Sequence, residues 1–208
     1  MQAMTPVFYS FRRCPYAMRA RLALVSAQVP VCLREVVLKD KPQAFLNASP
    51  SGTVPCLVTD QGVIDESLDI MIWALKQNDP ERLLDMPDTG WQLIETCDGP
   101  FKAALDRTKY ATRYPESDQG VARAQAAEFL YALEAQLSQS LFGKATLADL
   151  AILPFVRQFA FIDKPWFDAQ DWPRLRHWLA QFLASDAFSA IMPKYPQWQP
   201  GHDAVGFP

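Results

Sequence analysis

A cysteine at the start of an expected helix is the residue of this sequence best suited to chemistry. Cys14 is followed by Pro15, and the segment Ser10–Ala17 joins a short apolar run, 7–9, to a long helical pattern. The first turn of a helix leaves amide N–H groups without intrahelical partners, and the helix dipole places partial positive charge there. A sulfur at this end is stabilised as the nucleophilic thiolate, so we expect a lowered pKa for Cys14. The alternative is a small buried side chain, because free cysteines are among the most buried residues.

The residues around this cysteine favour the reactive interpretation. Arg12 and Arg13 stand directly before it and add positive charge beside the expected thiolate. Pro15 suits the first position of a helix, because that position needs no N–H donor and proline already has a helical φ. The pattern therefore predicts that Cys14 is the working residue.

The composition argues against several other classes of protein. The chain has 208 residues, half of them hydrophobic, which is enough for one large domain or two modest ones with a substantial core. Its net charge is −3 and no block of basic residues occurs, so neither nucleic acid nor an anionic membrane is an expected partner. No segment reaches 18 unbroken apolar residues, and arginines interrupt the N-terminal region before it reaches the length of a secretory signal.

The remaining cysteines and the histidines suggest no metal site and no disulfide framework. The four cysteines are scattered along a chain much longer than the usual disulfide-rich scaffold, which favours reduced thiols and a cytoplasmic location. No C-x-x-C occurs, and His177 and His202 lie far from the cysteines and from each other, so no metal is expected. Cys32 and Cys56 fall in expected strands and Cys97 on an apolar helical face, so all three are expected in the core.

Residues 1–78 are expected to form one domain in which strands and helices alternate. Runs of β-branched and aromatic residues predict the strands, and breaker-free stretches with apolar residues at helical spacing predict the helices. The expected order is strand 5–10, helix 15–28, strand 31–38, short helix or turn 42–47, strand 56–59 preceded by Val54-Pro55, turn 60–62, strand 63–64 and a helix from 65 to about 77. This order is βαβα-ββα.

Strand signals vanish in the second half of the chain. Residues 79–88 carry two prolines and a polar turn and are expected to form a linker, which leaves 89–208 as an all-helical domain. Helical patterns cover 91–110, with a bend at Gly99-Pro100, then 117–141 and 173–184. Thr146 and Asp149 have the spacing of a capping box, so another helix is expected to begin there.

Taken together, these elements resemble a known architecture. The first domain is similar to the thioredoxin fold, and with the helical domain after it the chain resembles the cytosolic glutathione transferases. Cys14-Pro15-Tyr16-Ala17 resembles the monothiol site of the omega class and differs by one residue from the C-P-Y-C of glutaredoxins. Three further segments fall where that class contacts glutathione: 39–42, Val54-Pro55 and Glu66-Ser67. The segment 146–150 resembles the capping box of the second domain of that class.

The resemblance implies a glutathione site made of five residues besides Cys14. It implies that Pro55 follows a cis peptide bond and that the Val54 backbone pairs with the cysteine of glutathione. It places Glu66 and Ser67 at a helix start, where they would hold the γ-glutamyl end, and Lys41 at the glycyl carboxylate. Because Ala17 leaves no resolving thiol in the motif, the implied chemistry is monothiol exchange through a mixed disulfide with glutathione.

Glutathione is therefore the expected cosubstrate, acting with a small or glutathionylated second substrate. Analogy with the family implies a possible homodimer and a second-substrate pocket formed by the helical domain, around residues 91–114. Two other functions stay open at this point. One is a conventional transferase that conjugates electrophiles to glutathione, and the other is a binding or scaffold protein that keeps the fold without turnover.

Overall fold

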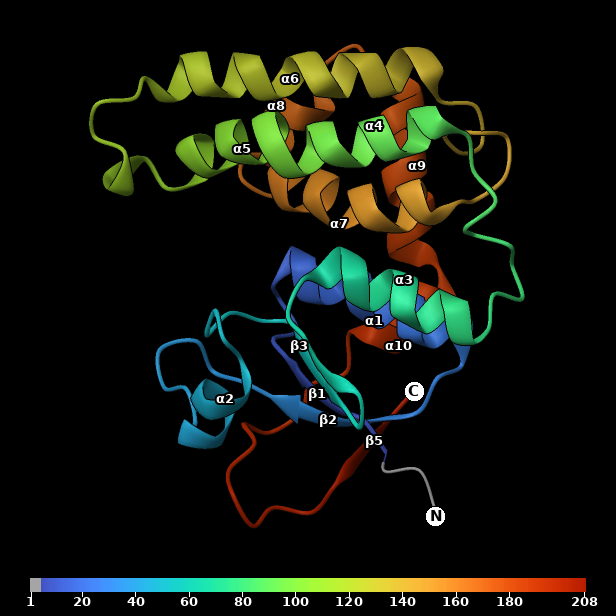
Figure 1. Cartoon of the computed structure of the whole chain (residues 1–208). Coiled ribbons are helices and arrows are strands. Elements are labelled where there is room, and N and C mark those ends of the chain that lie inside the picture. Colours follow the sequence, from blue (N-terminus) through green and yellow to red (C-terminus); the bar gives the residue numbers. More distant parts are fainter. Residues whose placement is uncertain (1–4) are drawn as a thin grey trace. The chain divides into compact units, whose positions relative to one another are not determined.

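Strands and helices alternate in the first third of the chain, before a run of helices begins (Figure 1). The computed structural model describes residues 5–208. Contacts divide it into unit 1, which extends to Leu84 and resumes at Ser185, and unit 2, Asp85–Ala184. The elements of unit 1 are β1 Val7–Ser10, α1 Pro15–Ala27, β2 Val31–Glu35, α2 Gln43–Ala48, β3 Cys56–Thr59, β4 Gly62–Ile64, α3 Ser67–Gln77, α10 Asp186–Ile191 and β5 Val205–Phe207.

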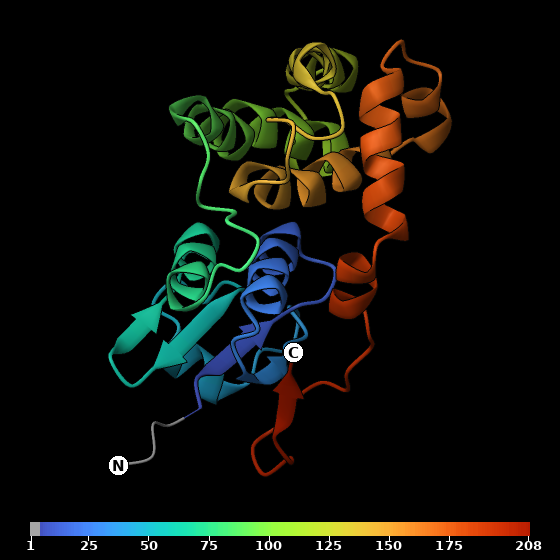
Figure 2. The same ribbon diagram turned by 90° about the vertical axis from the view of Figure 1, so that its right-hand side faces the viewer.

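A five-stranded mixed sheet forms the centre of unit 1, with the strand order β4-β3-β1-β2-β5. β1 runs parallel to β2 and antiparallel to β3, and the hairpin turn expected at 60–62 joins β3 to β4. α1 and α3 lie side by side over one face of this sheet (Figures 1 and 2). The predicted βαβα-ββα order of the first domain is confirmed.

The C-terminal segment differs from the expectation that 89–208 form one all-helical domain. Residues 185–208 belong to unit 1, where α10 packs on α1 and β5 pairs antiparallel with β2 (Figure 2). Phe207 and Ile191 anchor these two elements, since both side chains are buried. Three prolines at 193, 196 and 200 do interrupt regular structure, but the chain regains a strand beyond them because an unpaired edge of β2 accepts it.

Unit 2 is helical throughout. Its elements are α4 Asp88–Thr96, a π-helical turn Cys97–Phe101, α5 Lys102–Lys109, a 3₁₀ turn Ala111–Arg113, α6 Gln119–Gln136, α7 Leu147–Ala160, α8 Lys164–Asp168 and α9 Pro173–Ala184. The interruption expected at Gly99-Pro100 takes the form of the π-helical turn, which accommodates a proline that has no N–H to donate. The helix expected over 117–141 begins at Gln119, and its N-cap is Asp118, whose carboxylate accepts the Val121 N–H at 2.9 Å.

The capping box expected at Thr146 is present and buried. The Asp149 carboxylate accepts the backbone N–H and the hydroxyl of Thr146, both at 2.8 Å, and the N–H of Leu141 at 3.0 Å. Burial raises the pKa of Asp149, and these hydrogen bonds offset only part of that effect. The box therefore fixes both the start of α7 and the loop that precedes it.

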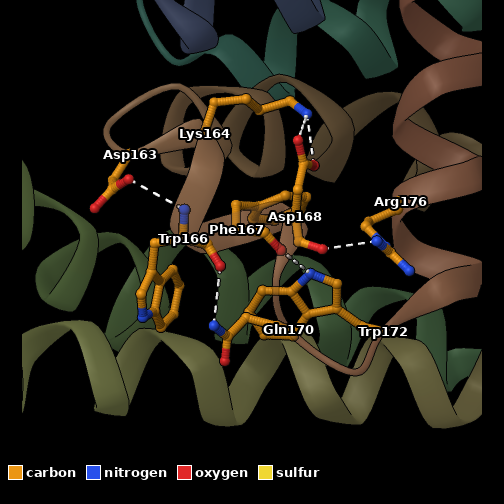
Figure 3. Close-up of polar contacts among 8 residues, drawn as sticks. All are labelled: Asp163, Lys164, Trp166, Phe167, Asp168, Gln170, Trp172 and Arg176. Carbon is orange, nitrogen blue, oxygen red and sulfur yellow. Dashed lines mark hydrogen bonds and ion pairs between the residues drawn. The ribbon is translucent and has the colours of Figure 1, made fainter.

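The short helix α8, between α7 and α9, packs against the aromatic core of unit 2 (Figure 3). Asp163 caps α8 by accepting the Trp166 N–H at 3.1 Å. The indole N–H of Trp172, a side chain that is fully buried, donates to the Phe167 carbonyl at 2.8 Å. Rings from this helix pack against Trp172, so this connection contributes to the core of unit 2. No helix within residues 5–208 is long and apolar enough to cross a membrane.

Candidate active site

Cys14 lies at the N-cap of α1, directly before Pro15 at the first helical position. Its backbone N–H donates to the Phe11 carbonyl at 2.9 Å, which closes a tight turn between β1 and α1. The side chain is half-buried and its sulfur lies 3.7 Å from the Val54 carbonyl, to which the thiol donates. The first-turn amides of α1 are therefore beside a sulfur that solvent can reach.

The other cysteines stand in different surroundings. Cys56 and Cys97 are fully buried, as expected. Burial, assisted by the neighbouring Asp65 carboxylate, raises the pKa of Cys56 to about 12, so its thiol stays neutral at ordinary pH. Cys32 is only half-buried, contrary to the expectation of a core residue, because side chains alternate along β2 and Cys32 lies on the opposite face from buried Val31 and Leu33.

The loop before β3 brings Val54 and Pro55 to the cysteine. Both residues are buried, and the peptide bond between them is cis, as the resemblance implied. Lys41, expected to meet a carboxylate of the ligand, donates its ammonium to the Gly52 carbonyl at 2.9 Å. Gly52 has a φ of 64°, a left-handed conformation that glycine adopts without strain. Lys41 thus binds this loop at Gly52, two residues before Val54, and supports it.

Asp65 joins this loop to the start of α3, and sequence reasoning did not identify it. Its carboxylate accepts the hydroxyl of buried Ser49 at 2.8 Å and the N–H of Ser51 at 2.9 Å. Burial raises the pKa of Asp65, but hydrogen bonds from Ser51, Ser49 and Cys56 outweigh that effect and hold the pKa below its ordinary value. The carboxylate therefore stays ionised and fixes the loop relative to α3.

Glu66 and Ser67 lie at the start of α3, as expected. Glu66 is the N-cap and is exposed, and its carboxylate makes no capping hydrogen bond. Ser67 is buried, and its hydroxyl accepts the Nε–H of buried Arg19 from α1 at 3.0 Å. Since one lone pair of this hydroxyl is occupied, its hydrogen is available for an acceptor. Arg19 was not identified from the sequence, where its charge only marked an interruption of an apolar stretch.

A buried ion pair supports the turn that carries Cys14 from the other side. Arg21 of α1 donates to the Glu35 carboxylate at 2.5 Å and to the Ser10 hydroxyl at 2.8 Å. Glu35 also accepts the backbone N–H of Arg12 at 2.8 Å. Burial lowers the pKa of Arg21, and the charge of Glu35 opposes that effect. The Glu35 carboxylate thus holds Arg12 directly and Ser10 through Arg21, one residue on each side of Phe11.

Hydrogen bonds connect the residues predicted for the site into one region of unit 1. Cys14 contacts Val54, the loop ahead of Val54 is held by Lys41 and Asp65, and Asp65 directly precedes Glu66 and Ser67. The arrangement combines a solvent-accessible thiol at a helix start with a backbone segment and a second helix start nearby. Within residues 5–208, no group of three or more potential metal-ligating side chains is present.

Comparisons with protein families match both halves of the chain. Residues 8–82 match the family model described as glutathione S-transferase, N-terminal domain, and residues 94–181 match glutathione S-transferase, C-terminal domain. The chain is 25% identical over 201 residues to glutathione S-transferase omega-1 of Sus scrofa, which covers 88% of this chain and 78% of that protein. It is 34% identical over 94 residues to the chloroplastic glutathione S-transferase DHAR3 of Arabidopsis thaliana, covering 43% of this chain but only 36% of that protein.

Solved structures share the fold at lower identity. A glutathione transferase family member from Pseudomonas fluorescens, crystallised with two glutathione molecules bound, superposes with a TM-score of 0.77 at 18% identity, covering 90% of this chain and 92% of that one. Glutathione transferase Omega 3C from Trametes versicolor gives a TM-score of 0.75 at 18% identity, covering 89% and 83%.

Proposed function

We propose that this chain, an omega-like member of the glutathione transferase superfamily, catalyses glutathione-dependent thiol transfer with Cys14 as the nucleophile. The observation that carries the proposal is the position of Cys14 at the N-cap of α1, half-buried, with its sulfur 3.7 Å from the Val54 carbonyl. A thiolate at a helix start is stabilised by the first-turn amides, and a thiolate is the form that attacks disulfides.

The reaction takes two exchange steps. The Cys14 thiolate attacks the glutathione sulfur of a mixed disulfide, a new S–S bond forms to Cys14, and the substrate sulfur leaves as a thiolate that takes a proton from water. A second glutathione, as its thiolate, then attacks the glutathione sulfur of this adduct, which forms oxidised glutathione and returns Cys14 as the thiolate. Ala17 supplies no thiol to resolve the adduct internally, so the second glutathione is required.

Glutathione is proposed to lie along the region that joins Val54 to the start of α3. The Val54 backbone would pair with the cysteinyl residue of glutathione beside Pro55. The first-turn amides of α3 and the Ser67 hydroxyl would hold the γ-glutamyl carboxylate, while exposed Glu66 meets its ammonium. Lys41 would bind the glycyl carboxylate if it gave up its hydrogen bond to the Gly52 carbonyl. If it keeps that bond, its role is to support the loop.

The decisive experiment replaces the proposed nucleophile. Cys14→Ser should abolish the exchange between a glutathionylated peptide and glutathione, while glutathione still binds in calorimetry. Cys32→Ser, which alters the other half-buried thiol, is the matched control and should keep full activity. Unchanged turnover in Cys14→Ser would refute the proposal, and faster turnover of an aryl halide than of the mixed disulfide would favour a conjugating transferase instead.

A protein with no turnover would behave differently again. Such a binding or scaffold protein would bind glutathione without exchanging it in any of these assays.

We extend the proposal, from the family resemblance, to a second substrate that is small or glutathionylated and to a homodimer. Light scattering of the purified chain tests the oligomeric state.

A further inference from the structure

The C-terminal segment, residues 185–208, reaches the turn that carries Cys14. The Ile191 carbonyl at the end of α10 accepts a hydrogen bond from the Arg21 guanidinium at 3.0 Å. The next carbonyl, of Met192, accepts one from the Arg12 guanidinium at 3.4 Å. Arg12 stands two positions before Cys14, so the end of α10 is connected to the residues that precede the reactive sulfur.

These contacts converge on the buried Glu35 carboxylate. One carboxylate oxygen accepts the Arg12 backbone N–H at 2.8 Å and the other accepts Arg21 at 2.5 Å. Arg21 also donates to Ser10, so both ends of the segment 10–12 are held by one ion pair whose side chains are 0% and 9% exposed. Breaking such a pair is costly, because removing one partner leaves an uncompensated buried charge, so the pair holds this segment in place.

The segment beyond α10 adds contacts at the same place. The Trp198 N–H donates to the Glu35 backbone carbonyl at 2.9 Å, and the Trp198 ring lies 4.0 Å from the Arg34 guanidinium. Between these contacts and β5 is a hollow of about 420 Å³ lined in part by Glu35, Tyr195 and Val205. The segment is therefore attached at separate points rather than packed continuously along β2.

We propose that residues 185–208 act as a positioning element for Cys14, with Arg12, Arg21 and Glu35 as the positioning residues. The inference rests on the proposed function and deepens it. The hydrogen bonds described above for these three residues involve none of Lys41, Val54, Pro55, Glu66 and Ser67, the residues proposed to bind glutathione. Loss of the positioning contacts should therefore slow the exchange chemistry without weakening glutathione binding.

Kinetics of Glu35→Gln test this directly. Displacement of a nucleophile by about 1 Å can cost roughly a hundredfold in rate, so we expect kcat to fall by roughly ten- to a hundredfold. The KM for glutathione should stay within about twofold. Because partial unfolding also lowers the apparent kcat without changing KM, kcat is calculated per folded enzyme, with the folded fraction measured by circular dichroism under the assay conditions. Lys144→Gln, which breaks the exposed Lys144–Asp85 pair of unit 2, is the control and should change neither constant.

A second variant covers the case in which Glu35→Gln does not fold. Arg12→Met keeps the Arg21–Glu35 pair and removes the bond to Met192, so it should fold and still lower kcat several-fold. Because it also removes a positive charge beside Cys14, kcat is measured as a function of pH: a loss from positioning persists at pH values where the thiolate is fully formed, whereas a loss from the charge alone disappears there.

Hydrogen exchange of the peptide 10–14 gives a readout independent of turnover. Trp198→Ala keeps the backbone N–H that bonds Glu35 but removes the ring contacts with Arg34 and Tyr9 that help to hold the segment, so it should speed hydrogen exchange there. Unchanged kcat in Arg12→Met together with unchanged exchange in Trp198→Ala would overturn the inference.

The two proposals fail in distinguishable ways. If Cys14→Ser is inactive and the positioning variants behave like wild type, only the inference about the C-terminal segment is wrong. If Cys14→Ser keeps full activity, the proposed function is wrong. The hydrogen-exchange experiment on the peptide 10–14 then still decides whether residues 185–208 order the turn before Cys14.

Discussion

Asp65→Asn tests whether one carboxylate holds the loop that brings Val54 to Cys14. The side chain accepts Ser49 through one oxygen and Ser51 through the other. Asparagine keeps one acceptor and presents an NH₂ group to the other donor, so one charge-assisted hydrogen bond is lost. Such a bond contributes about 1.5–3 kcal/mol. Because Asp65 is half-buried, solvent screening reduces the figure, and we expect a loss of about 1–2 kcal/mol at pH 7.

The pH dependence of this loss follows from the pKa of Asp65, which is held below the ordinary value of 3.8. A carboxyl group with a lowered folded-state pKa stabilises the protein in full above its ordinary pKa, and this contribution is lost as the pH falls from that value through the folded-state pKa. The difference between wild type and Asp65→Asn should therefore be complete at pH 7 and shrink toward zero below pH 3.8. The pKa of Cys56 should fall in the variant, because the Asp65 charge is one of the causes that raise it.

Urea unfolding at several pH values, with a glutathione titration at pH 7, measures these effects. Glutathione affinity should fall by no more than roughly tenfold, the equivalent of 1.4 kcal/mol, since the loop is loosened and no proposed contact is removed. Asp60→Asn, in the exposed turn between β3 and β4, is the matched control. A loss of stability equally large at low pH, or none at pH 7, would refute the assigned role of Asp65.

Three other perturbations probe the rest of the chain. Because burial raises the pKa of Cys56 from 9.0 to about 12, stability should decline on the order of 4 kcal/mol as the pH rises through that window, and Cys56→Ala should flatten the profile in urea titrations. Trp172→Phe leaves a cavity and removes the shorter of two hydrogen bonds to the Phe167 carbonyl, which keeps the one from the Gln170 N–H at 3.4 Å; it should cost about 2–4 kcal/mol in urea unfolding. Trp91→Phe, at a 38% exposed side chain, should cost little. Asp149→Ala removes acceptors from Thr146 and Leu141 and should cost about 2–4 kcal/mol by the same measurement; a loss below 1 kcal/mol would contradict the role of the box.

Elements with local signals could be predicted from the sequence. The helix 173–184 and the capping box at Thr146 agree with the structure, since helix caps and breakers act over a few residues. The start of α1 at Pro15 is of the same kind and fixes the position of Cys14. The predicted glutathione contacts and the second-substrate region at 91–114 stay predictions.

Features that depend on distant pairing could not be predicted. β5 has three residues, too few for a period-2 pattern, and it forms because β2 offers a free edge. The paired residues lie far apart in the sequence: Cys32 of β2 pairs with Gly206 of β5, 174 positions later. The buried pair of Arg21 and Glu35 was not predicted, because a single sequence does not reveal that a helical arginine and a strand glutamate meet in the interior. Cys32 was misplaced because membership of a strand does not decide which face a side chain occupies.

Two carboxylates thus hold the two sides of the candidate site, and their independence can be tested. Asp65 fixes the loop that ends at Val54, and Glu35 fixes the turn that ends at Cys14; the hydrogen bonds of the two carboxylates have no residue in common. The stability losses of Asp65→Asn and Glu35→Gln should add within about 0.5 kcal/mol in the double variant. In kcat, however, the two should couple, because the Cys14 thiol contacts the Val54 carbonyl and both must be in place together. Additive stability with coupled turnover would locate the connection at that contact, whereas strictly additive effects on turnover would show that the loop and the turn serve separate steps.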